Sequence, residues 1–239
     1  MKMRKFCLLS VTACMIAGSI VFTSCNKDSG GSGGSTFKSI TAKVDNDKDV
    51  DSVDEVGAII YYSAGEREVA SGDYKNGGFT IDFPGSVGNQ YLMKIEDFCY
   101  QLIDIDVKIS NESARIAFVW FEGFTQSGSY VGDFYHEKES GSSASEALYV
   151  YVDENCTIKG SEKDGDYSCT IDISLKEGWN IFYYTETKTT ETLTSKDPGG
   201  LKWIFYDDTG YKSQQSEGAI QKSAKRSSLS KIKQFPKVK

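Results

Sequence analysis

The sequence predicts an all-β protein, built as one or more antiparallel β-sandwiches or as a barrel. Three observations support this fold class. Short segments alternate between apolar and polar residues, turn-forming residues separate these segments, and no long helical stripe occurs between residues 36 and 210. Together they predict many short strands joined by tight turns.

The alternating segments predict strands with one buried and one solvent-exposed face. Apolar residues occupy every second position in 40–44, 79–83 and 169–173. A period of two places successive side chains on opposite faces of a sheet. These segments are therefore expected to cover a hydrophobic core on one side only.

Other segments are apolar at nearly every position and predict central strands that are covered on both faces. These runs are 56–62, 116–121 and 148–152. Residues that favour turns lie between the predicted strands. They form the segments 63–65, 75–78, 84–85, 177–178 and 197–200.

The first 24 residues have the pattern of a secretory signal peptide. Three basic residues, Lys2, Arg4 and Lys5, precede an apolar run from Phe6 to Phe22. A membrane-spanning helix needs about 20 strongly apolar residues, and this run is shorter and less apolar. Residues 1–24 are therefore predicted to be removed on export.

Residues 22–25, Phe-Thr-Ser-Cys, resemble the lipobox of bacterial lipoproteins, although Leu, Val or Ile is commoner in the place of Phe22. The resemblance implies cleavage before Cys25 and acylation of its thiol. Residues 25–35 continue with Asn-Lys-Asp and a Gly/Ser run, which predicts a flexible tether. Lys27 and Asp28 resemble the export tag of Bacteroidota surface lipoproteins. This resemblance implies lipid anchoring in the outer membrane, at the cell surface.

A possible domain boundary lies near residue 110. The body is therefore expected to be either one β-domain or two packed β-domains, 36–109 and 110–210. The segments 56–62, 68–72 and 76–84 resemble the transthyretin-like or carboxypeptidase-regulatory-like β-sandwich. The resemblance implies a β-sandwich for the first part. The whole body, with late strands opening at 178–181 and 200–203, is similar to Bacteroidota surface lipoproteins, which implies no particular activity.

Charge is distributed unevenly along the chain. Residues 211–239 hold eight Lys or Arg and one acid, whereas the whole chain has a net charge of −7. The body is therefore strongly acidic, which argues against nucleic acid as a partner. The basic tail, 211–239, is expected to be either a solvated, disordered end or a segment that contacts anionic lipid head groups or the acidic body.

Three cysteines remain after the signal peptide and Cys25: Cys99, Cys156 and Cys169. Cys156 and Cys169 flank a predicted hairpin turn at 160–166, so they form either a cross-strand disulfide or two buried thiols.

No metal or other cofactor is expected. There is no CxxC pair, and His136 is the single histidine. The aspartates at 45, 47, 49 and 51 partly match a calcium loop. Val50 and Val56 replace the required Gly and Glu, so a solvated acidic loop is the favoured interpretation.

Aromatic residues are the candidate ligand contacts, since outward rings beside polar groups can stack on sugars. For each one, packing in the core is the competing interpretation. Tyr183 and Tyr184, being adjacent, are expected on opposite faces. The full set of candidates is Trp120, Tyr130, Trp179, Tyr183, Tyr184 and Trp203.

The favoured function is non-catalytic binding of a glycan or another surface component by a protein held at the membrane through its lipid. No serine lies in a nucleophile motif, and the single histidine offers little support for catalysis. A structural or assembly accessory of a cell-envelope complex, with an envelope protein as its partner, is the alternative. A polysaccharide hydrolase that uses two carboxylates is the least favoured hypothesis.

Overall fold

The computed structural model describes residues 35–102 and 105–207, and within them 15 strands accompany one α-helix and two short 3-10 helices. This confirms the predicted all-β class. The signal peptide, Cys25, most of the tether and the basic tail lie outside the described residues. The last residue of the predicted tether, Ser35, begins β1 (Ser35–Thr36), which pairs with β13 (Gly178–Glu186).

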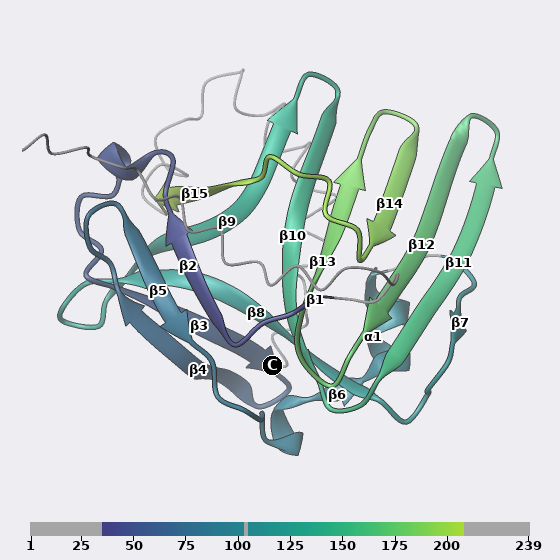
Figure 1. Cartoon of the computed structure of the whole chain (residues 1–239), viewed down its shortest axis with the longest axis horizontal. Coiled ribbons are helices and arrows are strands. Elements are labelled where there is room, and N and C mark those ends of the chain that lie inside the picture. Colours follow the sequence, from purple (N-terminus) through teal and green to yellow (C-terminus); the bar gives the residue numbers. More distant parts are fainter. Residues whose placement is uncertain (1–34, 103–104, 208–239) are drawn as a thin grey trace, which may run out of the picture. The chain divides into compact units, whose positions relative to one another are not determined.

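Most strands belong to one large sheet, in the order β4-β3-β8-β9-β10-β13-β14-β12-β11-β7 (Figure 1). Three further strands, β1, β6 and β15, attach to its members. Nearly all neighbours are antiparallel, and the exception is the parallel pair of β12 and β14. The bounds are β3 Glu55–Tyr62, β4 Gly65–Asp73, β6 Met93–Lys94, β7 Lys108–Ile109, β8 Arg115–Phe124, β9 Tyr130–Ser140, β10 Ser143–Val152, β11 Cys156–Asp164, β12 Tyr167–Leu175, β14 Thr190–Thr194 and β15 Lys202–Asp207.

A second sheet of two strands, β2 (Ser39–Lys43) and β5 (Gly78–Asp82), packs on one face of the large sheet. Figure 1 shows it lying over β3 and β8. The predicted alternation holds, because Ile40 and Ala42 are buried while their neighbours are exposed. The layer between the sheets, here named the aromatic core, includes Phe79, Phe121, Phe134, Tyr149, Trp179, Trp203 and Phe205.

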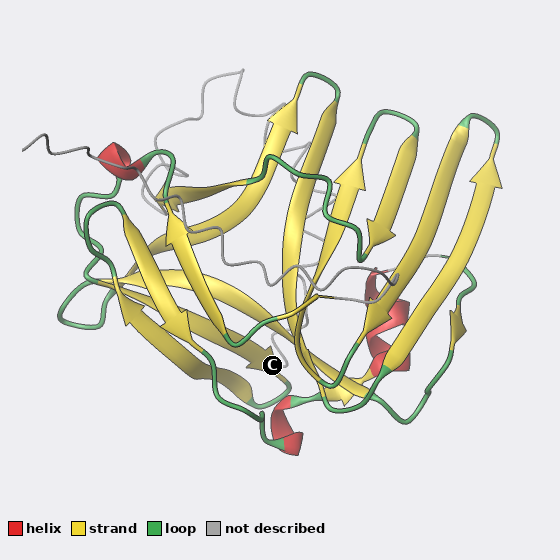
Figure 2. Cartoon of the chain, in the orientation of Figure 1, coloured by secondary structure: helices red, strands yellow, loops and turns green. Residues whose placement is uncertain are grey.

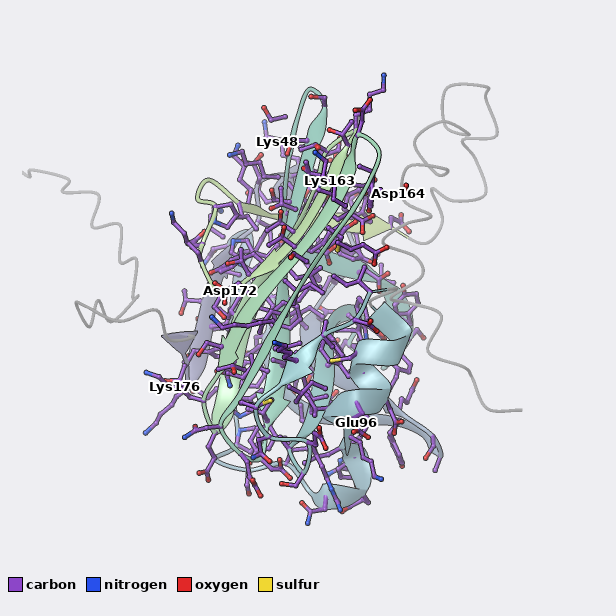
Figure 3. All side chains as sticks on the ribbon, turned by 90° about the vertical axis from the view of Figure 1, so that its right-hand side faces the viewer. Lys48, Glu96, Lys163, Asp164, Asp172 and Lys176 are labelled. Atoms are coloured by element: carbon purple, nitrogen blue, oxygen red, sulfur yellow. The ribbon has the colours of Figure 1, made fainter. Side chains whose placement is uncertain are left out.

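The opposite face of the large sheet carries a second core, which packs against helix α1 (Ile95–Leu102). Ile95, Phe98 and Cys99 lie at helical spacing and are all buried. Figure 2 shows this helix among the strands, and Figure 3 shows it, with Glu96, to one side of them. The sequence pattern did not predict this helix, because a helical stripe of only eight residues is short.

The predicted boundary near residue 110 does not interrupt the sheet. β3, from the first predicted domain, pairs with β8, from the second, over Glu55–Ile59 and Trp120–Phe124. The described strands on both sides of the boundary therefore share one hydrogen-bonded sheet.

The predicted turn at 75–78 forms with both of its central residues at positive φ, Asn76 at 54° and Gly77 at 71°. Lys75 and Gly78 exchange backbone hydrogen bonds across it. Asn-Gly suits this turn because both residues tolerate the left-handed region.

The candidate disulfide between Cys156 and Cys169 is wrong. The β11–β12 hairpin turns at 165–166, later than predicted, so Cys156 lies opposite Leu175 and Cys169 opposite Glu162. The two cysteines are therefore several residue pairs apart along the ladder, too far for a bridge. Cys156 and Cys169 are both free and buried, in agreement with the alternative interpretation.

Candidate functional site

Six carboxylates lie on one face of the large sheet, the face opposite the aromatic core, and they form three pairs directly opposite each other across neighbouring strands. Glu122 on β8 faces Asp133 on β9, and Glu137 on β9 faces Glu146 on β10. Further along the sheet, Glu186 on β13 faces Glu191 on β14. We name these residues the acidic stripe: Glu122, Asp133, Glu137, Glu146, Glu186 and Glu191.

The neighbours of these acids fix the face on which they lie. Phe121 and Phe134 point into the aromatic core, so the adjacent Glu122 and Asp133 point to the other side. Leu148 and Phe182 belong to the second core, so Glu146, two residues before Leu148, shares its face.

The path of β8 brings the first two pairs close together. Its first half pairs with β10, over 116–119, and its second half pairs with β9, over 121–124. β9 in turn pairs with β10 only near their common turn, over 137–140. The place where the three strands meet therefore carries Glu122, Asp133, Glu137 and Glu146 on one face.

Burial makes this arrangement costly. Glu122 is 8 % exposed and Glu146 is 7 % exposed, and the other four carboxylates are half-buried. Carboxylates are seldom buried unless they are paired, and like charges directly opposite each other destabilise a sheet. A face that gathers buried and half-buried acids in register beside phenols is the candidate functional site.

Tyrosine hydroxyls donate hydrogen bonds to the stripe. Tyr61 on β3 donates to Glu122, and Tyr206 on β15 donates to Glu137. Further donors include Tyr130 and Tyr135 to Asp133, at 3.0 and 3.3 Å, and Tyr184 to Glu186, at 3.4 Å. Four of the six carboxylates thus have a phenol hydroxyl beside them: Glu122, Asp133, Glu137 and Glu186.

Burial and the neighbouring carboxylates hold Tyr61 and Tyr184 in their protonated form. Burial, followed by the hydrogen bond to Glu122 and its charge, raises the pKa of Tyr61. Burial and the charges of Glu191 and Glu186 raise the pKa of Tyr184 in the same direction. These two hydroxyls therefore remain donors throughout the physiological pH range, so the stripe offers acceptors and donors side by side.

Three of the six predicted aromatic residues lie on this face. Trp120, half-buried, is two residues before Glu122 on β8, and Tyr130 is 43 % exposed. Tyr184 contacts Glu186 through its hydroxyl, but its ring is buried in the second core. Trp120 packs against the second core and is half-buried, so Tyr130 and the accessible part of Trp120 are the predicted rings at the surface of this face.

The prediction of ligand stacking is wrong for Trp179, Tyr183 and Trp203, because all three pack in the aromatic core. The indole N–H of Trp179 donates to the carbonyl of Pro84 at 2.6 Å. Tyr183 and Tyr184 do lie on opposite sides, as their adjacency predicted.

His136 belongs to the aromatic core as well. Its ring stacks on Trp203, with centroids 5.0 Å apart, and its Nδ1 lies 2.8 Å from the hydroxyl of Tyr149. Burial lowers the pKa of His136 to about 4. The imidazole is therefore neutral at pH 7 and has a packing role.

The acidic loop predicted at 45–51 carries ion pairs. Asp45 bonds Lys202, and Asp47 bonds Lys43. Within residues 35–102 and 105–207, no group of three or more His, Cys, Asp or Glu is arranged to hold a metal ion. A shallow polar depression near this loop, lined by 51–54 and 125–127, is separate from the stripe.

Sequence reasoning did not identify the carboxylates of the stripe or most of its tyrosines. One signal was present: Asp133, Tyr135 and Glu137 alternate with Phe134 and His136, which makes one face of β9 polar and aromatic. The sequence does not give the strand register, and the register is what places acids opposite acids.

Comparisons of this chain with protein-family models, with curated proteins and with solved structures found no match. The resemblances to transthyretin-like modules and to Bacteroidota lipoproteins therefore remain predictions. In the part of the chain that is described, no helix is long and apolar enough to cross a membrane.

Proposed function

We propose that this chain is a surface-exposed lipoprotein that binds a glycan without catalysis, through the acidic stripe and the aromatic residues beside it. The observation that carries the proposal is the joint presence of acceptors, donors and rings on one sheet face. Glu122, Asp133 and Glu137 supply acceptors, and Tyr130 and Trp120 supply rings.

Glycans present hydroxyl groups around a ring whose C–H faces are apolar. Carboxylate oxygens accept hydrogen bonds from such hydroxyls, and these charge-assisted bonds are the stronger kind. An exposed aromatic ring such as Tyr130 offers apolar area for the C–H face of a sugar. A rigid sheet also holds these groups in place before the ligand arrives, which limits the entropy lost on binding.

The location rests on the N-terminal sequence. The basic and apolar segments of 1–24, Cys25 and the Gly/Ser run to residue 35 are the features of an exported, lipid-anchored chain. Mass spectrometry of the membrane fraction would test it. An acylated Cys25 at the mature N-terminus supports the proposal, and an intact Met1 opposes it.

Binding is tested with the full mature chain on an array of bacterial, plant and host polysaccharides, followed by titration of the best ligand. Asp133→Asn removes one charge from the stripe, and we expect about a tenfold loss of affinity. Asp172→Asn is the matched control, because Asp172 pairs with Lys159 on the exposed side of β12. Absence of any glycan hit, or equal losses in both variants, would contradict the proposal.

The less favoured hydrolase hypothesis is tested on the same polysaccharides by measuring the release of reducing ends. Two carboxylates can cleave a glycosidic bond when about 5–10 Å separates them. The protein would be a hydrolase if it released reducing ends from the bound polysaccharide and if Glu122→Gln abolished that release.

A further inference from the structure

We propose that Asn76 is a site of spontaneous covalent modification, at which water converts the side-chain amide into aspartate or isoaspartate with help from Lys43. The site is the turn at 75–78, between β4 and β5, and it is separate from the acidic stripe. The proposal therefore goes beyond glycan binding and does not rest on it. Asn76 and Gly77 form the only Asn-Gly pair in the sequence.

The reaction starts when the backbone nitrogen of Gly77 loses its proton to hydroxide and bonds to Cγ of Asn76. The Cγ–Nδ2 bond then breaks, and the nitrogen takes a proton from water and leaves as ammonia, so that a five-membered succinimide remains. Water adds to one of the two ring carbonyl carbons, breaks its bond to the nitrogen and leaves aspartate or isoaspartate. No atom is oxidised or reduced, so water is the only reactant that the reaction needs.

The turn leaves both reacting groups accessible. Asn76 is exposed and Gly77 is half-buried. Among the residues that the structure describes, neither the side-chain amide of Asn76 nor the N–H of Gly77 makes a hydrogen bond, because the bonds of the turn join Lys75 to Gly78. Glycine also has no side chain that would shield its nitrogen. The amide of Asn76 is therefore free to rotate onto the nitrogen that follows it.

Lys43 contacts the peptide group that must ionise. Its ammonium donates a hydrogen bond to the backbone carbonyl oxygen of Asn76 at 2.8 Å. When Gly77 loses its proton, the negative charge spreads over its nitrogen and this same carbonyl oxygen. The ammonium therefore stabilises the charge that develops in the reaction, as the donors of an oxyanion hole do.

The register of the small sheet brings Lys43 to the turn. Lys43 is the last residue of β2 and lies opposite Gly78, the first residue of β5. Figure 1 shows the end of β2 and the start of β5 side by side. Lys43 also pairs with Asp47 at 3.4 Å, which keeps its ammonium near the turn.

The turn requires glycine at position 77 for two reasons. Its φ of 71° lies in the left-handed region, and an added Cβ would lie 2.5 Å from both Nζ of Lys43 and Oδ2 of Asp47. The residue that the turn needs for its geometry is therefore also the residue that leaves the preceding Asn76 open to attack.

The product changes the layer that covers the aromatic core. Isoaspartate adds one carbon to the main chain, so the two-residue turn no longer fits between Lys75 and Gly78, which exchange backbone hydrogen bonds. The next residue, Phe79, packs in the aromatic core. Modification of Asn76 should therefore loosen the pairing of β2 with β5 as the protein ages.

Peptide mass mapping of the full mature chain, after incubation at neutral pH, tests the site. We expect Asn76 to convert about tenfold faster than Asn111, whose side chain bonds Glu154 and Ser113 and would have to break these bonds first. Isoaspartate is detected by enzymatic methylation of the same peptides. Conversion of Asn76 that is absent, or no faster than that of Asn111, would overturn the proposal.

Variants of Lys43 test its part in the reaction. Lys43→Met should slow the conversion of Asn76 by about threefold, the effect expected of one solvent-exposed charge, whereas Lys43→Arg should keep most of the rate. The matched control is Lys75→Met, because Lys75 is exposed in the same turn but pairs with Asp73. Equal rates in all three variants would overturn the role of Lys43.

Two further measurements do not depend on any variant of Lys43. Concentrated urea removes the contact with Lys43, so the folded chain should convert Asn76 about threefold faster than the unfolded chain. Faster conversion in urea would mean that the fold protects the site, and it would overturn the proposal.

Hydrogen exchange in 39–43 and 78–82 should be about tenfold faster in the aged chain than in fresh protein. Fresh Asn76→Asp is the control, because it carries the new charge without the longer main chain and should exchange as fresh protein does. Equal exchange in aged and fresh protein would overturn the loosening of the β2–β5 layer.

Discussion

The two faces of the large sheet use similar residues for different purposes. On the face covered by β2 and β5, tryptophan, tyrosine and histidine pack against one another, as in the stack of His136 on Trp203. On the opposite face, tyrosines such as Tyr61 and Tyr206 donate to carboxylates. Aromatic content alone therefore does not locate a binding surface. The role of each ring depends on the face of the sheet on which it lies and on the residue opposite it on the neighbouring strand.

The second face is itself divided. Beside α1 it is a hydrophobic core in which Phe98, Phe118 and Phe182 contact one another. Toward β9 and β15, acids and phenols replace the apolar side chains. The comparison between stability and binding can therefore be made within one face.

Phe182→Ala should have the largest effect on stability. The side chain is fully buried between α1 and the sheet, so its truncation leaves a cavity. We expect a loss of about 3–5 kcal/mol in the free energy of unfolding, measured by urea titration. A loss below 1 kcal/mol would mean that the second core is loosely packed.

The aromatic core should make stability depend on pH through His136. Its pKa is about 4 in the folded protein and about 6.5 when unfolded, so between these values the unfolded state binds more protons. Its contribution is complete above pH 6.5 and is lost as the pH falls toward 4. We expect about 2 kcal/mol less stability at pH 5 than at pH 7 from this residue. His136→Gln should remove that part of the slope, and an unchanged slope would contradict its buried, neutral state.

Tyr61→Phe should lower both the stability of the protein and its affinity for the glycan. It removes the hydrogen bond to the buried carboxylate of Glu122 while keeping the ring. We expect a loss of about 1–3 kcal/mol in stability, and weaker glycan binding in a protein that is still folded at 25 °C. The control is Tyr91→Phe: Tyr91 contacts Tyr62 by its ring, and the change should alter neither quantity.

The sequence predicted the strands better than it predicted the site. Alternation placed Ile40 and Ala42 in the core, and the apolar run at 148–152 became a strand buried on both faces. Helix α1 was missed, because eight residues give too short a helical pattern to stand out. The hairpin of Cys156 and Cys169 was predicted, but its turn falls later in the chain, which removes the disulfide.

The site was only partly predictable, because the register between neighbouring strands decides which side chains lie opposite each other. Trp120 and Tyr130 could be selected by residue type, and they lie beside the stripe. Trp203 looked equivalent in the sequence, yet its position opposite His136 places it in the aromatic core. Glu122 lies opposite Asp133 because β8 pairs with β9 in this register. No local sequence pattern shows which strands pair.

The most direct test compares one aromatic residue from each face. Tyr130→Ala and Trp203→Phe are titrated with the same glycan, each after its folding has been verified by circular dichroism. If the stripe is the binding surface and the aromatic core is packing, Tyr130→Ala weakens binding by about tenfold, whereas Trp203→Phe changes it less than about twofold. Unchanged affinity in Tyr130→Ala, together with a loss in Trp203→Phe, would contradict the assignment of the two faces.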